Sequence, residues 1–203
     1  MDIFPISLKL QQQPCLIVGG GHIAYRKAVL LAKAGAALHV ISPDINANLL
    51  EIVEQSGGQY TKAAYGSGFA LRDYRLVIAA TDDKAVNQAV FEACEAENVL
   101  VNSVDDPPHC RFMVPAIIDR SPLVVSIATN GASPVLSRQI RTQLEASIPH
   151  GMGKLADFSG KWRAAVKAKI ENPDERRIFW EDLYASPLKE QVFNGNAVEA
   201  DHL

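Results

Sequence analysis

The residues best suited to chemistry begin with a glycine-rich turn, "VGGGHIA", that follows a short apolar run. Gly19, Gly21 and Ala24 match the pattern G-x-G-x-x-A. The first glycine of this pattern permits a tight turn, the second lets a pyrophosphate approach the backbone, and the small third residue lets helix and strand pack closely. We therefore predict a dinucleotide site here, with His22 and Ile23 beside the phosphates at a helix N-terminus. The alternative is a glycine-rich turn that binds nothing.

The chain after the second expected strand, residues 37–42, lacks the acidic residue that usually binds the adenosine ribose. It reads Ser42, Pro43 and Asp44 instead. The Ser42 hydroxyl could hydrogen-bond to the ribose, and Asp44 lies slightly late in the chain but within reach. No arginine follows to bind a 2′-phosphate, which favours NAD over NADP.

A second polar cluster, Thr81, Asp82 and Asp83, ends the apolar segment "LVIAATDD". In open α/β folds, ligands bind at the carboxyl ends of the strands. We assign Thr81 and Asp82 to the cofactor on this basis. The alternative is that the cluster caps the N-terminus of the next helix.

The first half of the chain alternates strand and helix patterns, which predicts an α/β fold with a parallel sheet covered on both faces. The expected strands are residues 15–21, 37–42, 60–66, 74–83 and 99–106, and the expected helices are residues 23–36, 45–57 and 85–98.

The second half has a different pattern. Two prolines make residues 106–112 a loop. Residues 113–131 give two short strands around an Asp-Arg-Ser-Pro turn, and residues 133–148 give a helix with Ser133 as its N-cap. Residues 153–192 are helical and rich in charge.

The bulk composition describes an ordinary soluble protein. The chain has 203 residues, is 48% hydrophobic and carries a formal net charge of -3, which argues against a nucleic-acid binder. Its three cysteines are far apart, so we expect neither a disulfide framework nor a thiolate zinc site, and the pattern is typical of a reducing cytoplasm. No signal peptide is evident, and no apolar run is long enough to cross a bilayer.

Five segments together point to a family: "CLIVGGGHIAYRKA", "VIAATDDKAVNQAV", "VNSVDD", "FMVPAIIDRSPLVVSIATNGASPVLSRQIR" and "ERRIFWEDLY". In this order they resemble the siroheme synthase N-terminal module, the NAD-dependent precorrin-2 dehydrogenase and sirohydrochlorin ferrochelatase. The resemblance covers residues 3–184. The glycine loop is shared by many enzymes, and the long segment after it is far more specific.

This resemblance implies a Rossmann-type NAD-binding domain at residues 1–113, a small α+β dimerisation region at residues 114–147 and a helical domain at residues 148–203. It implies a homodimer that acts on a tetrapyrrole, with NAD as cofactor and ferrous iron as co-substrate. It implies a uroporphyrinogen methyltransferase, fused or separate, as a partner. It implies no nucleic acid and no membrane as a partner.

The resemblance also implies a general acid/base role for Asp105, at the end of an expected strand, in both dehydrogenation and iron insertion. From spacing alone, a strand-end carboxylate that caps the next turn is the better interpretation. Asp105 could also contact the metal, as could His109 beside Cys110. The family does not share this His-Cys pair, and such a dipeptide is more often structural or exposed.

A polycarboxylate substrate requires cations. Residues 109–177 hold eleven Lys or Arg against six Asp or Glu, a local surplus of five positive charges. A basic concavity would steer and hold such a substrate, whereas the alternative is a solvated helical surface. The residues that we assign to substrate binding are Asn130, Ser133, Arg138, Arg141 and Arg111.

Thr129 aligns with a serine that is phosphorylatable in some members of the family, so it is a candidate phosphorylation site. The alternative is that Thr129 and Ser133 bind substrate or cap the helix.

Two other function classes stay open at this stage. One is a regulatory NAD-binding module that senses redox state without turnover, and the other is an NAD-dependent oxidoreductase acting on a different small anion. A sensor needs neither Asp105 nor a basic substrate region, which favours the enzyme.

Overall fold

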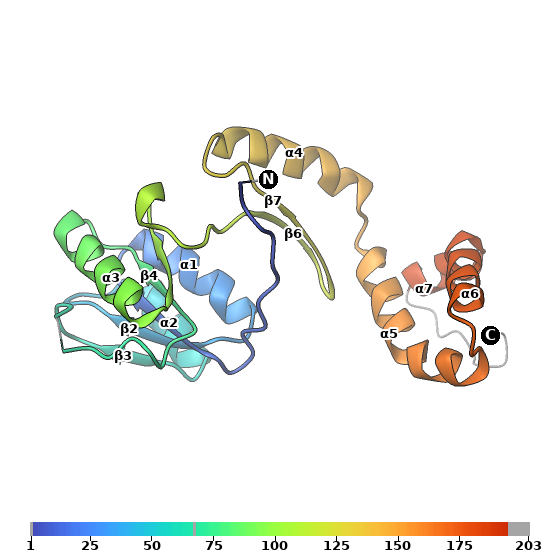
Figure 1. Ribbon diagram of the computed structural model, residues 1–203, viewed down its shortest axis with the longest axis horizontal. Coiled ribbons are helices and arrows are strands. Elements are labelled where there is room, and N and C mark those ends of the chain that lie inside the picture. The colour runs from blue at the N-terminus through green and yellow to red at the C-terminus, as the bar shows by residue number, and fades with distance from the viewer. Residues whose placement is uncertain (1, 67, 195–203) are drawn as a thin grey trace. The chain divides into compact units, whose positions relative to one another are not determined.

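The computed structural model describes residues 2–66 and 68–194, and the chain divides into two compact units, Met1–Met113 and Val114–Leu203 (Figure 1). The first unit contains the parallel sheet, and the second contains a hairpin and helices. The expected further division at residues 147 and 148 stays a prediction, and the last nine residues of the expected helical domain, 195–203, lie outside the described residues. No helix in the described ranges is both long and apolar enough to span a membrane.

The first unit is built on a five-stranded parallel sheet with the order β3-β2-β1-β4-β5. This confirms the predicted Rossmann-type α/β fold. The strands are β1 (Pro14–Val18), β2 (Ala37–Ile41), β3 (Gln59–Thr61), β4 (Leu76–Ala79) and β5 (Leu100–Ser103), and the helices are α1 (His22–Lys33), α2 (Ala47–Gln55) and α3 (Lys84–Glu97).

The strands end earlier than their sequence patterns suggest. The last residues of these patterns lie in loops at the carboxyl edge of the sheet and not in the hydrogen-bonded ladder. β4 ends at Ala79, so Thr81, Asp82 and Asp83 lie in a loop. β1 likewise ends at Val18, directly before the glycines. Every loop that carries a predicted cofactor residue therefore starts at the same edge of the sheet.

Alternation along each strand separates the core of this unit into two layers. Cys15 and Ile17 of β1 pack in one cluster with buried residues of α1 and α2. Leu16 and Val18 pack in the other cluster with Val90 and Cys94 of α3. Both faces of the sheet are thus covered, as a parallel sheet requires.

Short polar side chains determine where two of these helices begin. The Asn46 side chain accepts hydrogen bonds from the backbone N–H groups of Asn48 and Leu49 at the start of α2. The Asp83 carboxylate accepts from Ala85 and Val86 at the start of α3. The capping alternative for the Thr81–Asp83 cluster is therefore correct for Asp83.

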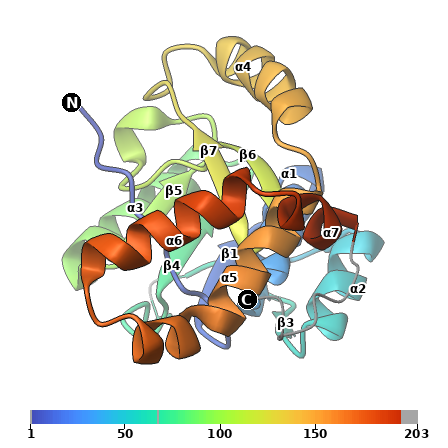
Figure 2. The same cartoon turned by 90° about the vertical axis from the view of Figure 1, so that its right-hand side faces the viewer.

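The second unit begins with an antiparallel hairpin of β6 (Ala116–Arg120) and β7 (Leu123–Ile127). Its helices are α4 (Pro134–Ser147), α5 (Gly151–Lys169), α6 (Pro173–Ala185) and α7 (Leu188–Asn194) (Figure 2). Ser133 caps α4 through the N–H of Leu136, which confirms the expected start of this helix. Leu155, Leu183 and Val192 join α5, α6 and α7 in a small core.

The α5 helix packs closely on the end of the hairpin at one glycine. A Cβ on Gly153 would overlap the backbone carbonyl groups of Arg120 and Ser121. The missing side chain therefore lets the helix backbone approach the hairpin backbone.

We expect Asp83→Ala to lower the free energy of unfolding by about 1 kcal/mol, because two N–H groups of α3 lose their acceptor. Urea denaturation followed by circular dichroism measures the change. The matched control is Asp82→Ala, which removes the same charge one residue earlier and no cap; equal destabilisation by both variants would contradict the capping role.

Candidate functional site

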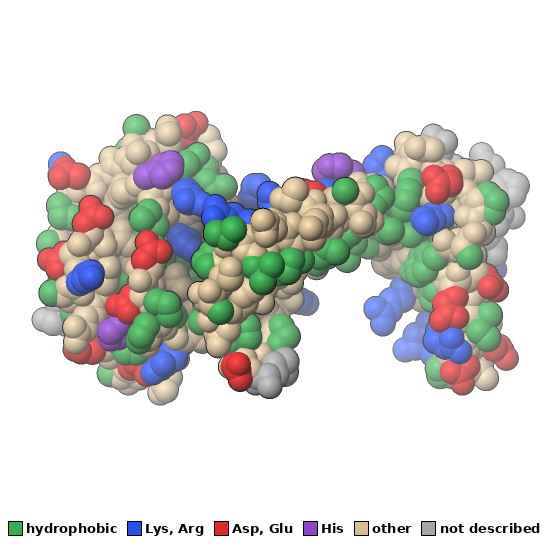
Figure 3. All heavy atoms as spheres, turned by 90° about the horizontal axis from the view of Figure 1, so that it is seen from above, with side chains coloured by type: hydrophobic (Ala, Val, Ile, Leu, Met, Phe, Trp, Pro, Cys, Tyr) green, Lys and Arg blue, Asp and Glu red, His purple; other side chains and the backbone are tan. Residues whose placement is uncertain are grey.

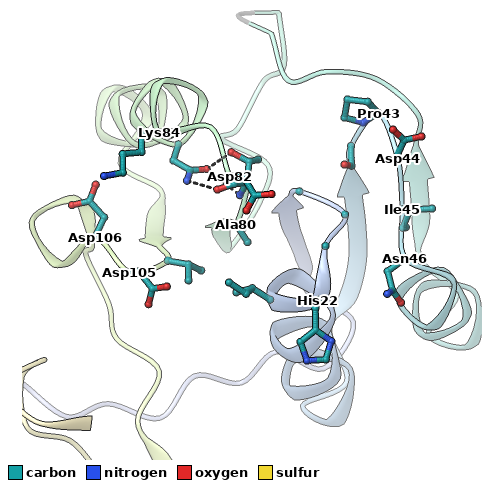
Figure 4. Close-up of a pocket in the computed structure, with 18 residues that line it drawn as sticks. His22, Pro43, Asp44, Ile45, Asn46, Ala80, Asp82, Lys84, Asp105 and Asp106 are labelled. Atoms are coloured by element: carbon teal, nitrogen blue, oxygen red, sulfur yellow. Dashed lines mark hydrogen bonds between the residues drawn. The ribbon is translucent and has the colours of Figure 1, made fainter.

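A pocket of about 970 Å³ opens at the carboxyl ends of β1, β2, β4 and β5 (Figure 4). This is the edge where open α/β sheets bind ligands. It brings together ten of the residues predicted for cofactor binding and catalysis: Gly19, Gly21, His22, Ile23, Ser42, Pro43, Asp44, Thr81, Asp82 and Asp105. Ala24 is the exception, because it is fully buried in the core, where its small side chain lets α1 pack on the sheet.

The glycine loop is in close contact with the loops on both sides of it. Gly19 has a φ of +123°, and a Cβ there would overlap the carbonyl oxygen of Ala80 after β4. A Cβ on Gly20 would overlap the carbonyl oxygen of Asp44 after β2. The motif does not single out Gly20, since its constraint comes from a loop more than twenty residues away in the chain.

Gly21 differs from its two neighbours, because a Cβ there would have no atom within 4 Å. The open space lies directly before α1, which begins at His22. The first N–H groups of a helix and its dipole favour a phosphate at this position. Packing within the described chain therefore does not require glycine at Gly21, and the open space is large enough for the backbone approach of a pyrophosphate that the motif predicts.

The β2 side of the pocket is formed by the loop that contains Asp44 (Figure 4). Ser42 is buried, and its carbonyl oxygen accepts a hydrogen bond of 3.0 Å from the Tyr60 hydroxyl. The N–H of Asn46 donates to the carbonyl oxygen of Gly20 at 2.8 Å, which attaches this loop to the glycine loop. Asp44 is exposed, and within residues 2–66 and 68–194 its carboxylate makes no hydrogen bond or ion pair, so it is available to a ribose.

On the β4 side, Thr81 is held by Asn87 of α3. The Thr81 hydroxyl lies 2.8 Å from the Asn87 side-chain oxygen, and the Asn87 amide donates to the Thr81 carbonyl at 2.9 Å. Thr81 therefore shapes the loop, while Asp82 points into the pocket (Figure 4). Sequence reasoning missed Asn87, whose signal is only its position in the first turns of the helix after the cluster.

Asp105 lies where β5 ends, with a backbone φ of +59°, a left-handed conformation that aspartate adopts more readily than most residues. In the described ranges, its carboxylate makes no hydrogen bond or ion pair. The Asp105 charge acts on Lys27 of α1, an interaction that the sequence did not reveal. Burial lowers the pKa of the Lys27 ammonium, as does the charge of Arg26, while the Asp105 and Cys110 charges act to raise it.

Asp106, His109 and Cys110 make hydrogen bonds and ring contacts with one another and with neighbouring groups of the protein. His109 Nδ1 lies 2.8 Å from Asp106 Oδ2, and its ring meets the Phe91 ring edge-on at 4.8 Å. The Cys110 thiol donates to the Ser103 carbonyl at 3.1 Å, and burial raises its pKa. Among residues 2–66 and 68–194, no three His, Cys, Asp or Glu side chains are grouped as a metal site. Metal contact by His109 stays a prediction.

The predicted substrate arginines are divided between the units. Arg111 belongs to the first unit, where its guanidinium forms a two-point ion pair with Glu95 and lies over the Phe91 ring. In the second unit, Arg141 lies 3.7 Å from Glu145, and Arg138 is exposed. Arg111 and Arg141 thus already have partners, which weakens their assignment to the substrate.

The turn before α4 is closed by Thr129. Its hydroxyl accepts a hydrogen bond of 3.1 Å from the N–H of Ser133 and lies 3.2 Å from the hydroxyl of buried Ser137. Asn130 is exposed with a φ of +51°. These contacts are those of the capping alternative, and phosphorylation of Thr129 stays a prediction.

The parallel sheet, the glycine loop and the open space at Gly21 define a dinucleotide-binding α/β protein. The chain belongs to the putative NAD(P)-binding family, whose model matches residues 6–116. Residues 120–147 match the sirohaem biosynthesis protein central region, and residues 151–203 match the sirohaem synthase dimerisation region. Together these are the parts of the siroheme synthase N-terminal module, as the resemblance predicted. The dimerisation model matches residues 151–203, whereas we expected the dimerisation region at residues 114–147.

Two proteins with similar sequences are both named siroheme synthase. A siroheme synthase of Acinetobacter baylyi is 69% identical over 196 residues, which cover 97% of this chain and 43% of that protein. A siroheme synthase of Saccharophagus degradans is 47% identical over 203 residues, which cover 100% of this chain and 44% of that protein. The chain therefore spans less than half the length of these relatives. The solved structure of SirC, a precorrin-2 dehydrogenase, has the same fold, with a TM-score of 0.75 at 24% identity over 95% of this chain and 98% of its own.

We expect Gly21→Asp to fold normally but to bind NAD+ at least about a hundredfold more weakly, because a carboxylate would occupy the place of the pyrophosphate. Isothermal titration calorimetry measures binding, and thermal unfolding checks the fold. Gly20→Ala is the contrasting variant, since its Cβ overlaps Asp44 and should lower stability itself. Wild-type affinity in Gly21→Asp would contradict the assignment of this loop.

Proposed function

We propose that this chain oxidises precorrin-2 to sirohydrochlorin with NAD+. The observation that carries the proposal is the Asp105 carboxylate, which has no partner among the described residues and lines the same pocket as the glycine loop. The names of the relatives and of the SirC structure support the choice of substrate.

The two sides of the pocket suit the two ends of the cofactor. The end of β2 is where this fold binds the adenosine ribose, and Asp44 lies there with a carboxylate that has no partner in the part of the chain that the structure describes. The pyrophosphate would meet the N–H groups at Gly21 and His22. The opposite side, after β4 and β5, is left for the nicotinamide, beside Asp82 and Asp105.

NAD+, when bound, supplies the acceptor for the hydride that leaves the reduced tetrapyrrole. The protein must remove the accompanying proton. Asp105 is suited to this because no side chain of the described residues is bound to its oxygens, so a lone pair is free to accept the proton.

Insertion of ferrous iron into sirohydrochlorin is the second step that we propose. It releases two pyrrole protons, and Asp105 is again the base that the pocket offers. The siroheme synthase names of the relatives support this step. We also propose a cytoplasmic homodimer, supported by the dimerisation region, and a methyltransferase partner, which would account for the remaining length of the relatives.

The decisive experiment incubates the protein anaerobically with enzymatically made precorrin-2 and NAD+ and records the absorbance of sirohydrochlorin. We expect product in proportion to NADH formed, and siroheme after ferrous ion is added. Binding of NAD+ without product would contradict the dehydrogenase and favour the sensor. Formation of sirohydrochlorin without insertion of iron would contradict only the proposed iron insertion.

We expect Asp105→Asn to lower the rate of dehydrogenation by about 10²–10⁴-fold, the usual contribution of a general base. NAD+ affinity should stay within about twofold of wild type, since the change adds no bulk. Asp106→Asn is the matched control, because the neighbouring carboxylate is engaged by His109. An equal loss in both variants would indicate a general effect of charge rather than proton transfer by Asp105.

We expect Asp44→Ala to weaken NAD+ binding by about tenfold or more, because a charge-assisted hydrogen bond to the ribose is lost. NADP+ affinity should change little or rise, because the repulsion of a 2′-phosphate is also removed. Glu54→Ala on α2 is the control for the loss of a surface carboxylate. Unchanged NAD+ affinity in Asp44→Ala would assign the ribose to Ser42 or the backbone.

A further inference from the structure

Lys84 is a cation in a pocket that otherwise gathers carboxylates. Among the described residues that line the pocket at the carboxyl edge of the sheet, it is the one Lys or Arg. The acidic residues of the same lining are Asp44, Asp82, Asp105 and Asp106. In the sequence, Lys84 is one of twenty Lys and Arg residues, and neither the family models nor the resemblance gives it a role.

The Lys84 ammonium has no partner within the part of the chain that the structure describes. Lys84 is exposed, and it makes no hydrogen bond or ion pair with any described residue. In Figure 4 its side chain points toward the side of the pocket where Asp106 lies and away from Asp44. The Asp106 carboxylate is engaged by His109, whose Nδ1 lies 2.8 Å from Asp106 Oδ2. The ammonium is therefore available to a ligand that enters on this side of the pocket.

The position of Lys84 is unfavourable for the helix that carries it. Lys84 is the first residue of α3, and the first turn of this helix holds no acidic residue. A cation at this place faces the positive end of the helix dipole. The Asp83 cap offsets part of that repulsion, but its carboxylate accepts from the N–H groups of Ala85 and Val86 and not from the Lys84 ammonium. The stability of α3 therefore does not account for a lysine here.

Exposure alone does not distinguish Lys84 from other lysines of this unit. On the face that Figure 3 shows, acidic and basic side chains are interspersed over the surface of the first unit. Lys62, for example, is exposed and makes no hydrogen bond or ion pair with the described residues, and it does not line the pocket. What sets Lys84 apart is its place in the lining, in the same pocket as the proposed base Asp105.

The layout of the pocket indicates which anion Lys84 would meet. The cofactor pyrophosphate would lie at Gly21 and His22, where the start of α1 supplies N–H groups. Lys84 follows β4, which lies between β1 and β5 in the sheet, so it belongs to the side of the pocket that holds Asp105. An anionic substrate on that side is repelled by the carboxylates of Asp82 and Asp105, and one ammonium in the lining offsets this repulsion.

We propose that Lys84 binds one carboxylate of the substrate, in the same pocket as Asp105. An ammonium on a flexible four-carbon stem has three donors and can adjust to the position of a carboxylate. The charge-assisted hydrogen bond holds that end of the substrate on the β4 and β5 side of the pocket. Only the identity of the substrate rests on the proposed function.

The test compares Lys84→Gln with wild type in two assays. We expect KM for precorrin-2 to rise about tenfold while kcat stays within about threefold, because the lost bond holds the substrate before and during the reaction. We expect the dissociation constant of sirohydrochlorin, measured anaerobically by equilibrium dialysis with NAD+ present, to rise by a similar factor. Lys84→Arg should restore most of both losses, because it restores the charge.

The matched control is Lys62→Gln, which removes the same charge from the same unit outside the pocket and should behave as wild type in both assays. Equal values of KM and of sirohydrochlorin affinity in the two glutamine variants would overturn the proposal. A tenfold loss of NAD+ affinity in Lys84→Gln, measured by calorimetry without substrate, would also overturn it and assign the ammonium to the cofactor phosphates. We expect Lys84→Gln to melt at or above the temperature of wild type, because a cation leaves the positive end of α3.

The two assays also separate failure of this proposal from failure of the proposed function. If wild-type protein formed no sirohydrochlorin, the dehydrogenase would be contradicted, and dialysis would still decide the role of Lys84. Weaker binding of sirohydrochlorin in Lys84→Gln than in Lys62→Gln would then sustain the carboxylate site, whereas equal binding would overturn it. Turnover by wild type with the same KM in both variants would sustain the dehydrogenase and overturn the role of Lys84.

Discussion

The close approach of three backbone loops at the carboxyl edge of the sheet is the constraint on which the site depends. Gly19 lies against the carbonyl of Ala80, and Gly20 lies against the carbonyl of Asp44. The absence of two side chains therefore draws the loops after β1, β2 and β4 together, and the N–H of Asn46 bonded to the Gly20 carbonyl holds them there. The glycine loop is therefore tightly packed at Gly19 and Gly20 and open at Gly21. This is the shape that a pyrophosphate needs.

Much of this arrangement is predictable because its causes are local. Strand and helix periods give the α/β fold, and strand ends identify the edge where Thr81, Asp82 and Asp105 lie. The remaining features are tertiary. Thr81 is engaged by Asn87, Arg111 by Glu95, and Lys27 approaches Asp105 from another element. Residue type predicts that a polar group seeks a partner, but only the packed fold determines whether that partner belongs to the protein or to a ligand.

Whether a polar side chain already has a partner within the protein separates the candidate residues better than residue type does. Arg111 and Arg141 were the obvious cations for a polyanion, yet both are paired with glutamates. In the sequence, Arg163 and Lys167 are two of many charges on a helix, and in the part of the chain that the structure describes they make no ion pair. A charge count records a surplus of charge and not the pairing of individual side chains, so it does not show which of these cations are free for a ligand.

Asp105 illustrates the same principle at the proposed catalytic position. A residue whose task was to end β5 would be expected to use its carboxylate as Asp83 does, by accepting nearby N–H groups. Asp105 makes no such bond in the described chain, although its left-handed backbone is a conformation that most side chains disfavour. The fold therefore places a carboxylate in a pocket without using it for stability. A polar group held in this way is most simply explained by a partner that arrives with the substrate.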